Sequence, residues 1–448
     1  MIQSKAIALE GTRNSERAMA QRSTSLPMLS VFDRSRWTAV IDWLAVGVAV
    51  SLPWSTSVTA ILVTLWVLAV LPTLDAAAVR RELTNPAAYL PVLLWVLAAI
   101  GMLWADVSWH DRIAGVGKFH RLLVIPLLLI HFRSSERGVW VIYGFFAASL
   151  ALLLVSWVLV LTPGLTWRGK ELGVPAKDYI FQSMSFLICV FALLGFACEA
   201  GRAHHWRRGV VAVALALLFV ADMFFVVTSR TALLVVPVLL VWLGWKEFRW
   251  RGLFGTLLLF LVLGSAAWSV SPYLHERLTR SITEYEAYRT KNAPNSTGLH
   301  LEFLRKSLIF VETAPIVGHG TGSISEQFRL SETGHDSATA FHSENPHNQI
   351  FAVAIQLGLA GTAVLIAMWI AHLLLFTGGS GLVAWLGTIV VVQNVVSSLF
   401  NSHLFDFTSG WLYVFGVGVL GGMVLRQKDL GKDIAFAFPL AGRKATLG

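Results

Sequence analysis

The sequence predicts an all-α polytopic membrane protein with about twelve transmembrane helices and one large outer loop that itself contains helices. Three observations lead to this prediction. Of the 448 residues, 56% are hydrophobic and only 14% are charged, whereas globular chains carry roughly 25% charged residues. The mean hydropathy is +0.66. The apolar residues also come in blocks of about 20, the length that crosses a bilayer core. These features exclude a soluble enzyme, a disordered chain and a disulfide-rich secreted module.

Twelve apolar segments are predicted to cross the membrane as helices. They lie near residues 38–54, 57–75, 88–105, 119–132, 139–161, 180–199, 209–227, 231–246, 252–271, 349–376, 381–400 and 408–425. The expected organisation is a basic N-terminus (1–37), nine helices (38–271), a long polar loop (272–348), three further helices (349–425) and a C-terminal tail (426–448).

The net charge of +9 is explained by membrane topology. In a soluble chain such a basic balance would suggest a nucleic-acid partner. Here 21 Lys and Arg residues lie in segments on one side of the predicted helices, against seven in the short loops on the other side. Lys and Arg collect in cytoplasmic loops. Both termini are therefore predicted to face the cytoplasm and the long loop to face outwards, and no nucleic acid is expected.

The long loop carries the patterns of a folded unit. A predicted helix over 299–313 has four apolar residues on one face, at Leu301, Leu304, Leu308 and Val311. A glycine-rich turn, PIVGHGTG at 315–322, follows that helix. Its glycines are spaced by two, unlike those of a dinucleotide-binding loop. We interpret the turn as the end of the helix and the loop as a helical unit.

Motifs of soluble catalysis are absent from the sequence. It contains no Walker loop, no Rossmann fingerprint, no Cys/His metal spacing and no nucleophile elbow. We therefore expect no nucleotide, metal or other cofactor.

Arg230 is the first candidate site residue, because the seventh predicted helix turns directly into the eighth at this point. Thr228 or Ser229 can cap the eighth helix, which places Arg230 at a helix N-terminus. Exposed N–H groups, the helix dipole and a guanidinium then converge, and this combination suits a phosphate group. The alternative is an interfacial arginine that reaches the lipid headgroups.

His347 and Asn348 form the second candidate, directly before the tenth predicted helix. A neutral imidazole at the outer membrane face can accept a proton from a sugar hydroxyl. A helix N-terminus lowers the pKa of such a histidine by disfavouring the imidazolium. The alternative is a histidine that only caps the helix or lies at the interface.

Several other basic residues are candidates for binding an anionic substrate. They are Arg112, Lys118 and Arg121 in an outer loop, and His300 and Arg305 on the predicted 299–313 helix. Such residues attract anionic lipid or a pyrophosphate headgroup. The alternative for all of them is ordinary solvated charge.

Three sequence segments together resemble the O-antigen ligase/polymerase superfamily of membrane glycosyltransferases. They are TSRTALL (228–234), ETAPIVGHGTGS (312–323) and PHNQIFAVAIQLGLAG (346–361). The resemblance extends over about residues 180 to 425, and the preceding helices match only in hydropathy.

The resemblance implies a GT-C-like fold and an active site on the periplasmic face of the bacterial inner membrane. Such proteins transfer a glycan from undecaprenyl pyrophosphate to an acceptor, without nucleotide or metal. In ligases the acceptor is a sugar of the lipid A-core. The implied partners are thus a lipid-linked glycan, lipid A-core and membrane lipid, while the sequence leaves the oligomeric state unknown.

The resemblance also assigns roles to residues. It makes His347 the general base of an inverting transfer and Arg230 a pyrophosphate ligand, with Asn348 beside the substrate. Family members often carry a second arginine in the helix before the glycine turn. That position is His300 or Arg305 here, depending on the register, and we favour Arg305.

Two other functions remain in competition. An O-antigen polymerase uses the same lipid-linked donor, and the single dominant outer loop favours the ligase over it. A secondary transporter would place ionisable residues at the membrane midplane. Asp222 is the main acidic residue within a predicted helix, which disfavours transport.

Overall fold

A computed structural model describes residues 34–162, 164–165, 172–226, 229–270, 272–334 and 337–431. Within these ranges the chain forms helices and no β-strand. The helices up to the long loop are α2 (Arg34–Ser51), α3 (Thr56–Val70), α4 (Ala76–Glu82), α5 (Pro86–Gly101), α6 (Trp109–Gly117), α7 (Val124–Ser134), α8 (Gly138–Leu161), α9 (Tyr179–Arg202), α10 (Trp206–Phe225) and α11 (Arg230–Val270). The remaining ones are α12 (Pro272–Lys291), α13 (Ser296–Thr313), α14 (Ile324–Leu330), α15 (Gln349–Thr377), α16 (Gly381–Ser397) and α17 (Phe407–Leu430).

Each of the twelve predicted segments lies on a described helix, but fewer of these helices are long and apolar enough to cross a membrane. Seven satisfy both conditions, or up to nine if the bent pairs α4–α5 and α6–α7 each form one span. The difference from twelve lies in α2, α11 and α16. α2 carries Arg34, Arg36 and Asp42, and α16 has only 17 residues. The chain is thus a multi-pass membrane protein, whereas the number of twelve spans stays a prediction.

α11 contains two of the predicted segments because the chain folds back within it. Arg249 has non-helical dihedral angles, with φ 55° and ψ −137°. A Cβ placed on Gly244 would lie 2.5 Å from the carbonyl oxygen of Gly252, although eight residues of straight helix rise about 12 Å. The two halves of α11 therefore lie against each other around Arg249.

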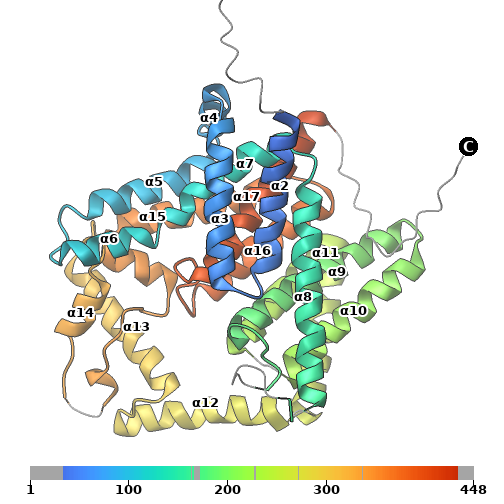
Figure 1. Cartoon of the computed structure of the whole chain (residues 1–448). Helices are drawn as coiled ribbons and strands as arrows, with labels where there is room; N and C mark the ends of the chain where they lie inside the picture. The colour runs from blue at the N-terminus through green and yellow to red at the C-terminus, as the bar shows by residue number, and fades with distance from the viewer. Residues whose placement is uncertain are drawn as a thin grey trace, which may run out of the picture.

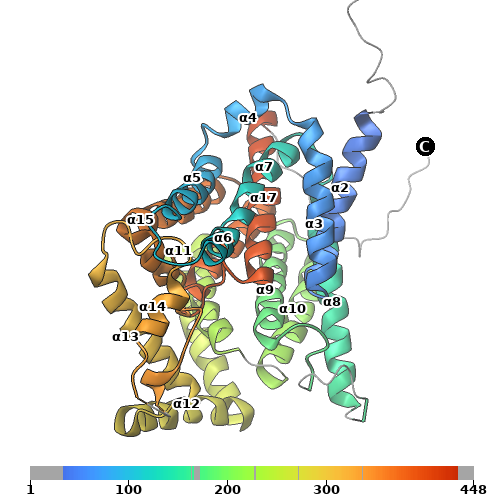
Figure 2. The same cartoon turned by 60° about the vertical axis from the view of Figure 1, so that its left-hand side comes forward.

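The long loop packs as a helical unit at one end of the bundle. α12 runs across that end, and α13 and α14 lie between it and α15 (Figures 1 and 2). The helix predicted over 299–313 is confirmed as α13. The apolar face predicted for it is wrong, since Leu304 and Leu308 are 40% and 49% exposed. The buried face instead presents Phe303 and Phe310, which pack edge-on against Phe328 of α14.

The glycine turn attaches this unit to α15. Gly358 interrupts the helical geometry of α15 with φ 61° and ψ −158°, and the carbonyl groups that this kink releases accept hydrogen bonds from the turn. His319 N donates to Ile355 O at 2.8 Å, and Gly320 N donates to Gln356 O at 2.9 Å. The two segments that resemble the superfamily most closely are therefore packed together, and they fix α13 beside the start of α15.

Candidate active site

Arg230 of α11, His300 of α13 and His347, which lies directly before α15, come together. The ring centroids of His300 and His347 lie 4.7 Å apart, with an interplanar angle of 66°. Phe303, one turn along α13 from His300, stacks on His347 at 5.6 Å. Arg230, the first residue of α11, is near enough for its positive charge to act on His300. Residues that are 117 positions apart in the chain thus share one site.

His347 is held in an unusual backbone conformation directly before α15. Its φ is +52°, a region that a non-glycine residue adopts only at a cost. Asn345 Oδ1 accepts a hydrogen bond from the His347 N–H at 2.9 Å. Asn348 caps the helix by accepting from Ile350 N and Phe351 N. These contacts fix the imidazole at the helix N-terminus.

The hydrogen bonds of Asn401 determine which nitrogen of His347 carries a proton. Asn401 Oδ1 accepts from Ser402 N at 2.9 Å, and its Nδ2 donates to Asp406 Oδ2 at 3.3 Å. This arrangement fixes the orientation of the amide, so that Oδ1 faces His347 Nδ1 at 3.2 Å as an acceptor. Nδ1 must therefore carry the hydrogen, which leaves the lone pair on Nε2.

Burial lowers the pKa of His347 below its usual value, while the hydrogen bond to Asn401 and the negative charge of Asp406 oppose part of that shift. The neutral imidazole is therefore the form present at neutral pH. A neutral histidine with a free Nε2 can accept a proton from a hydroxyl group.

His300 is also neutral at physiological pH. Burial, the neighbouring His347 and the positive charge of Arg230 lower the pKa of His300 to about 4, although part of its side chain remains open to solvent. A neutral His300 adds no positive charge beside His347. His347 can therefore take up a proton without electrostatic repulsion from His300.

Arg230 faces a carboxylate on α12. Its Nη2 lies 3.8 Å from Glu284 Oε2, and its Nη1 lies 3.5 Å from Thr297 Oγ1. Burial alone would raise the pKa of Glu284, but hydrogen bonds from Thr297 and Arg280 and the positive charge of Arg230 lower it. Arg280 Nε binds the other oxygen of the same carboxylate at 3.1 Å. Two guanidinium groups thus share Glu284 beside the histidine pair.

Residues 214–366 match the family model described as O-antigen ligase. The matched segment includes Arg230, His300 and His347. This match supports the resemblance of the chain to the O-antigen ligase/polymerase superfamily. Among curated proteins, an uncharacterized protein of Haemophilus influenzae is 25% identical over 169 residues, which are 37% of this chain and 42% of that relative.

The chain is therefore similar to O-antigen ligases over the segment that carries the candidate site. The matched region contains the three residues that the fold brings together. We therefore take the site formed by Arg230, His300 and His347 as the candidate active site.

Arg305 does not join the other predicted site residues. Its guanidinium binds the Glu302 carboxylate, with Nη2 at 2.6 Å from Oε1 and Nε at 3.0 Å from Oε2. Five helical residues correspond to a rotation of about 140°, so Arg305 and His300 point in different directions from α13. The geometry therefore favours His300, and not Arg305, at the position that faces Arg230 and His347.

Arg112 of α6 is held by contacts within its own loop. Arg112 donates to the carbonyl groups of Met102 and Val107 and stacks over Trp109. Arg112 therefore stabilises the loop between α5 and α6. Its described contacts assign it no place in the histidine cluster.

Arg121 and Lys118 lie near the start of α17. Arg121 is buried and donates to the carbonyl groups of Asp406 and Phe407. Lys118 interacts electrostatically with Glu344 and Asp406. Both cations are therefore connected to the site through Asp406, which is hydrogen-bonded to Asn401.

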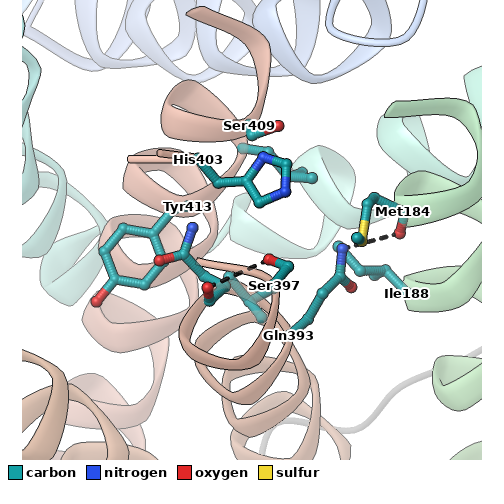
Figure 3. A pocket seen from close by; sticks show the side chains of 10 residues that line it. Met184, Ile188, Gln393, Ser397, His403, Ser409 and Tyr413 are labelled. Atoms are coloured by element: carbon teal, nitrogen blue, oxygen red, sulfur yellow. Dashed lines mark hydrogen bonds between the residues drawn. The ribbon is translucent and has the colours of Figure 1, made fainter. Parts of the chain in front are cut away.

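A pocket lies between α9, α16 and α17, beside the loop that carries Asn401 (Figure 3). Its polar lining consists of Gln393, Asn394, Ser397, His403, Ser409 and Tyr413. His403 is buried and its Nδ1 lies 3.1 Å from Asp406 Oδ2. The pocket is thereby joined to His347 through His403, Asp406 and Asn401.

The sequence analysis did not single out Asn401, Asp406, His403 or Glu284. A signal for the first three exists in the polar run NSH at 401–403 with Asp406, between two apolar segments near the predicted outer face. Glu284 lies within a stretch rich in charges, where no pattern distinguishes it from its neighbours.

Proposed function

We propose that the protein is an O-antigen ligase. It transfers an O-antigen glycan from undecaprenyl pyrophosphate to a sugar hydroxyl of lipid A-core. The observation that carries it is the neutral His347, whose Nδ1 faces Asn401 and whose ring lies beside that of His300, which the charge of Arg230 reaches. A base and a cation at one site are what a transfer from a pyrophosphate carrier to a hydroxyl requires.

His347 acts as the general base. The acceptor hydroxyl approaches Nε2 and gives up its proton there, while its oxygen attacks the anomeric carbon of the glycan. The bond from that carbon to the pyrophosphate oxygen breaks on the opposite face, so the anomeric configuration inverts. Asn401 accepts from Nδ1 throughout, and Asp406 stabilises the imidazolium from beyond the amide.

Arg230 stabilises the leaving pyrophosphate. Negative charge grows on the phosphate oxygens as the glycosidic bond breaks, and a fixed guanidinium at a helix N-terminus lowers the energy of that state. In the protein without substrate, Glu284 balances this charge. A bound pyrophosphate takes the place of Glu284 as the partner of Arg230.

The proposed orientation places this site in the periplasm and both termini in the cytoplasm. α12 lies at one end of the bundle, and α4 lies at the other (Figure 1). The second end carries basic side chains in ion pairs, such as Arg133 with Glu82 and Arg426 with Glu136. Basic residues at that end agree with a cytoplasmic face.

Product analysis tests the proposal. Membranes containing the protein, supplied with purified lipid-linked O-antigen and lipid A-core, are expected to form lipopolysaccharide with attached O-antigen. The His347→Ala and Arg230→Ala variants are expected to lose this product by about 100-fold or more at equal protein level. His342→Ala is the matched control, because His342 lies five residues away and pairs with Glu332.

Two outcomes contradict the proposal. Full transfer by His347→Ala removes the general-base role. Glycans that lengthen on undecaprenyl pyrophosphate without transfer to lipid A-core identify the protein as a polymerase.

A further inference from the structure

The pocket between α9, α16 and α17 contains three buried polar atoms with no hydrogen-bond partner in the described part of the chain. They are Gln393 Oε1, Asn394 Oδ1 and His403 Nε2. The three residues are 5%, 6% and 2% exposed, and all three line the pocket (Figure 3). A buried polar atom without a partner costs about 1–3 kcal/mol. Three of them around one space therefore indicate a site for a polar group.

The chemistry of these atoms specifies what fits there. Gln393 Nε2 donates to Met184 O at 3.1 Å, so the unpaired atom of this amide is its oxygen, an acceptor. His403 Nδ1 faces the Asp406 carboxylate at 3.1 Å, so it carries the hydrogen and Nε2 is an acceptor. A group that donates hydrogen bonds, such as a hydroxyl, satisfies both.

The size of the pocket limits the occupant. The pocket encloses about 300 Å³ including its open side. Its inner part has room for one or two groups of the size of a hydroxyl, so the rest of a ligand lies outside.

The pocket is also coupled to the proposed base. From His403 the hydrogen bonds run through Asp406 and Asn401 to His347. A hydroxyl that binds His403 Nε2 polarises this chain and strengthens each bond in it. Binding in the pocket therefore affects His347, the proposed base that removes the proton from the acceptor hydroxyl.

We propose that this pocket binds one or two hydroxyl groups of a sugar that is held for transfer, and that it selects the glycan on this basis. The proposal rests on the ligase function proposed above. The sugar belongs either to the lipid-linked donor or to the lipid A-core acceptor, and both offer the same hydroxyl chemistry.

Two variants test the pocket by different means. Asn394→Leu replaces the amide by an apolar side chain with the same number of heavy atoms, and so removes the unpaired oxygen without leaving another polar atom in its place. Ser409→Leu extends a side chain from α17 into the open space. Gln427→Leu is the matched control, because Gln427 also has a buried oxygen without a partner in the described chain but lies near the far end of α17.

The measurement is the KM for lipid-linked O-antigen and for lipid A-core, each varied with the other saturating. Asn394→Leu and Ser409→Leu are expected to raise one of the two KM values about tenfold or more, with unchanged melting temperature. A rise for lipid A-core assigns the sugar to the acceptor, and a rise for the lipid-linked glycan assigns it to the donor. Gln427→Leu is expected to change neither value.

The proposal is overturned if both pocket variants keep both KM values within about twofold of the parent protein. The pocket would then be a structural cavity that solvent fills. This failure differs from a failure of the ligase proposal, in which the parent protein itself forms no product. If the parent protein is inactive, the sugar assignment falls together with the function on which it rests.

Discussion

Replacing Asn401 by alanine tests the inference that this side chain sets the protonation of His347. The substitution removes the acceptor that lies 3.2 Å from His347 Nδ1. Nδ1–H then has no fixed partner, so the imidazole can place its proton on either nitrogen and can rotate. KM is expected to remain nearly unchanged, because Asn401 does not reach the substrate side of the ring.

The size of the effect follows from the geometry. A hydrogen bond to a charged group contributes about 1.5–3 kcal/mol, and His347 becomes charged when it accepts the proton. A distance of 3.2 Å is at the long end of the normal range, so the lower half of that interval applies. Since about 1.4 kcal/mol corresponds to a factor of ten in rate, kcat is expected to fall about 10- to 40-fold.

The assay is steady-state transfer in membranes across a range of pH. Asn401 raises the pKa of His347, so its loss is expected to move the acidic limb of the profile to lower pH while the plateau falls. The double variant Asn401→Ala/His347→Ala is expected to be no slower than His347→Ala alone. An additive loss in the double variant, or an acidic limb that does not move, would refute the reasoning.

Three further predictions follow from the same contacts. Arg280→Ala is expected to raise the KM for the lipid-linked donor about tenfold, because Arg280 and Arg230, the proposed pyrophosphate ligand, share the Glu284 carboxylate. Arg289→Ala on the same helix is expected to leave this KM unchanged. kcat/KM of the parent protein is expected to stay level as the pH falls to about 6.5 and to decline only below it, because burial lowers the pKa of His347 and the neutral form is the active one. A rate that already declines above pH 7 contradicts this sign. Gly358→Ala is expected to destabilise the protein by roughly 2–4 kcal/mol, measured as a lower melting temperature, since φ is +61° and the new Cβ would lie 2.3 Å from the carbonyl oxygen of Ile316. An unchanged melting temperature would contradict the inference that the packing of the glycine turn against α15 stabilises the protein.

The position of the apolar segments and two of the central site residues could be predicted from sequence. Blocks of about 20 apolar residues form helices in a membrane whatever their neighbours, because every backbone group must be hydrogen-bonded internally. Arg230 and His347 could be identified because each is polar and lies where an apolar segment begins. Their proximity in space could not be read from the sequence, since it depends on how α11 and α15 pack.

The remaining features were decided by the tertiary structure. His300 and Arg305 are both basic residues of α13, and only the rotation of that helix, set by Phe303 and Phe310 against α14, turns His300 towards His347. In the same way the sequence by itself determined that an imidazole stands at the start of α15. Only the fold brings Asn401 from the loop after α16 to that imidazole, and so decides which of its nitrogens carries the hydrogen. The physical reason is that a hydrogen bond depends on distance and direction, and packing between helices sets both.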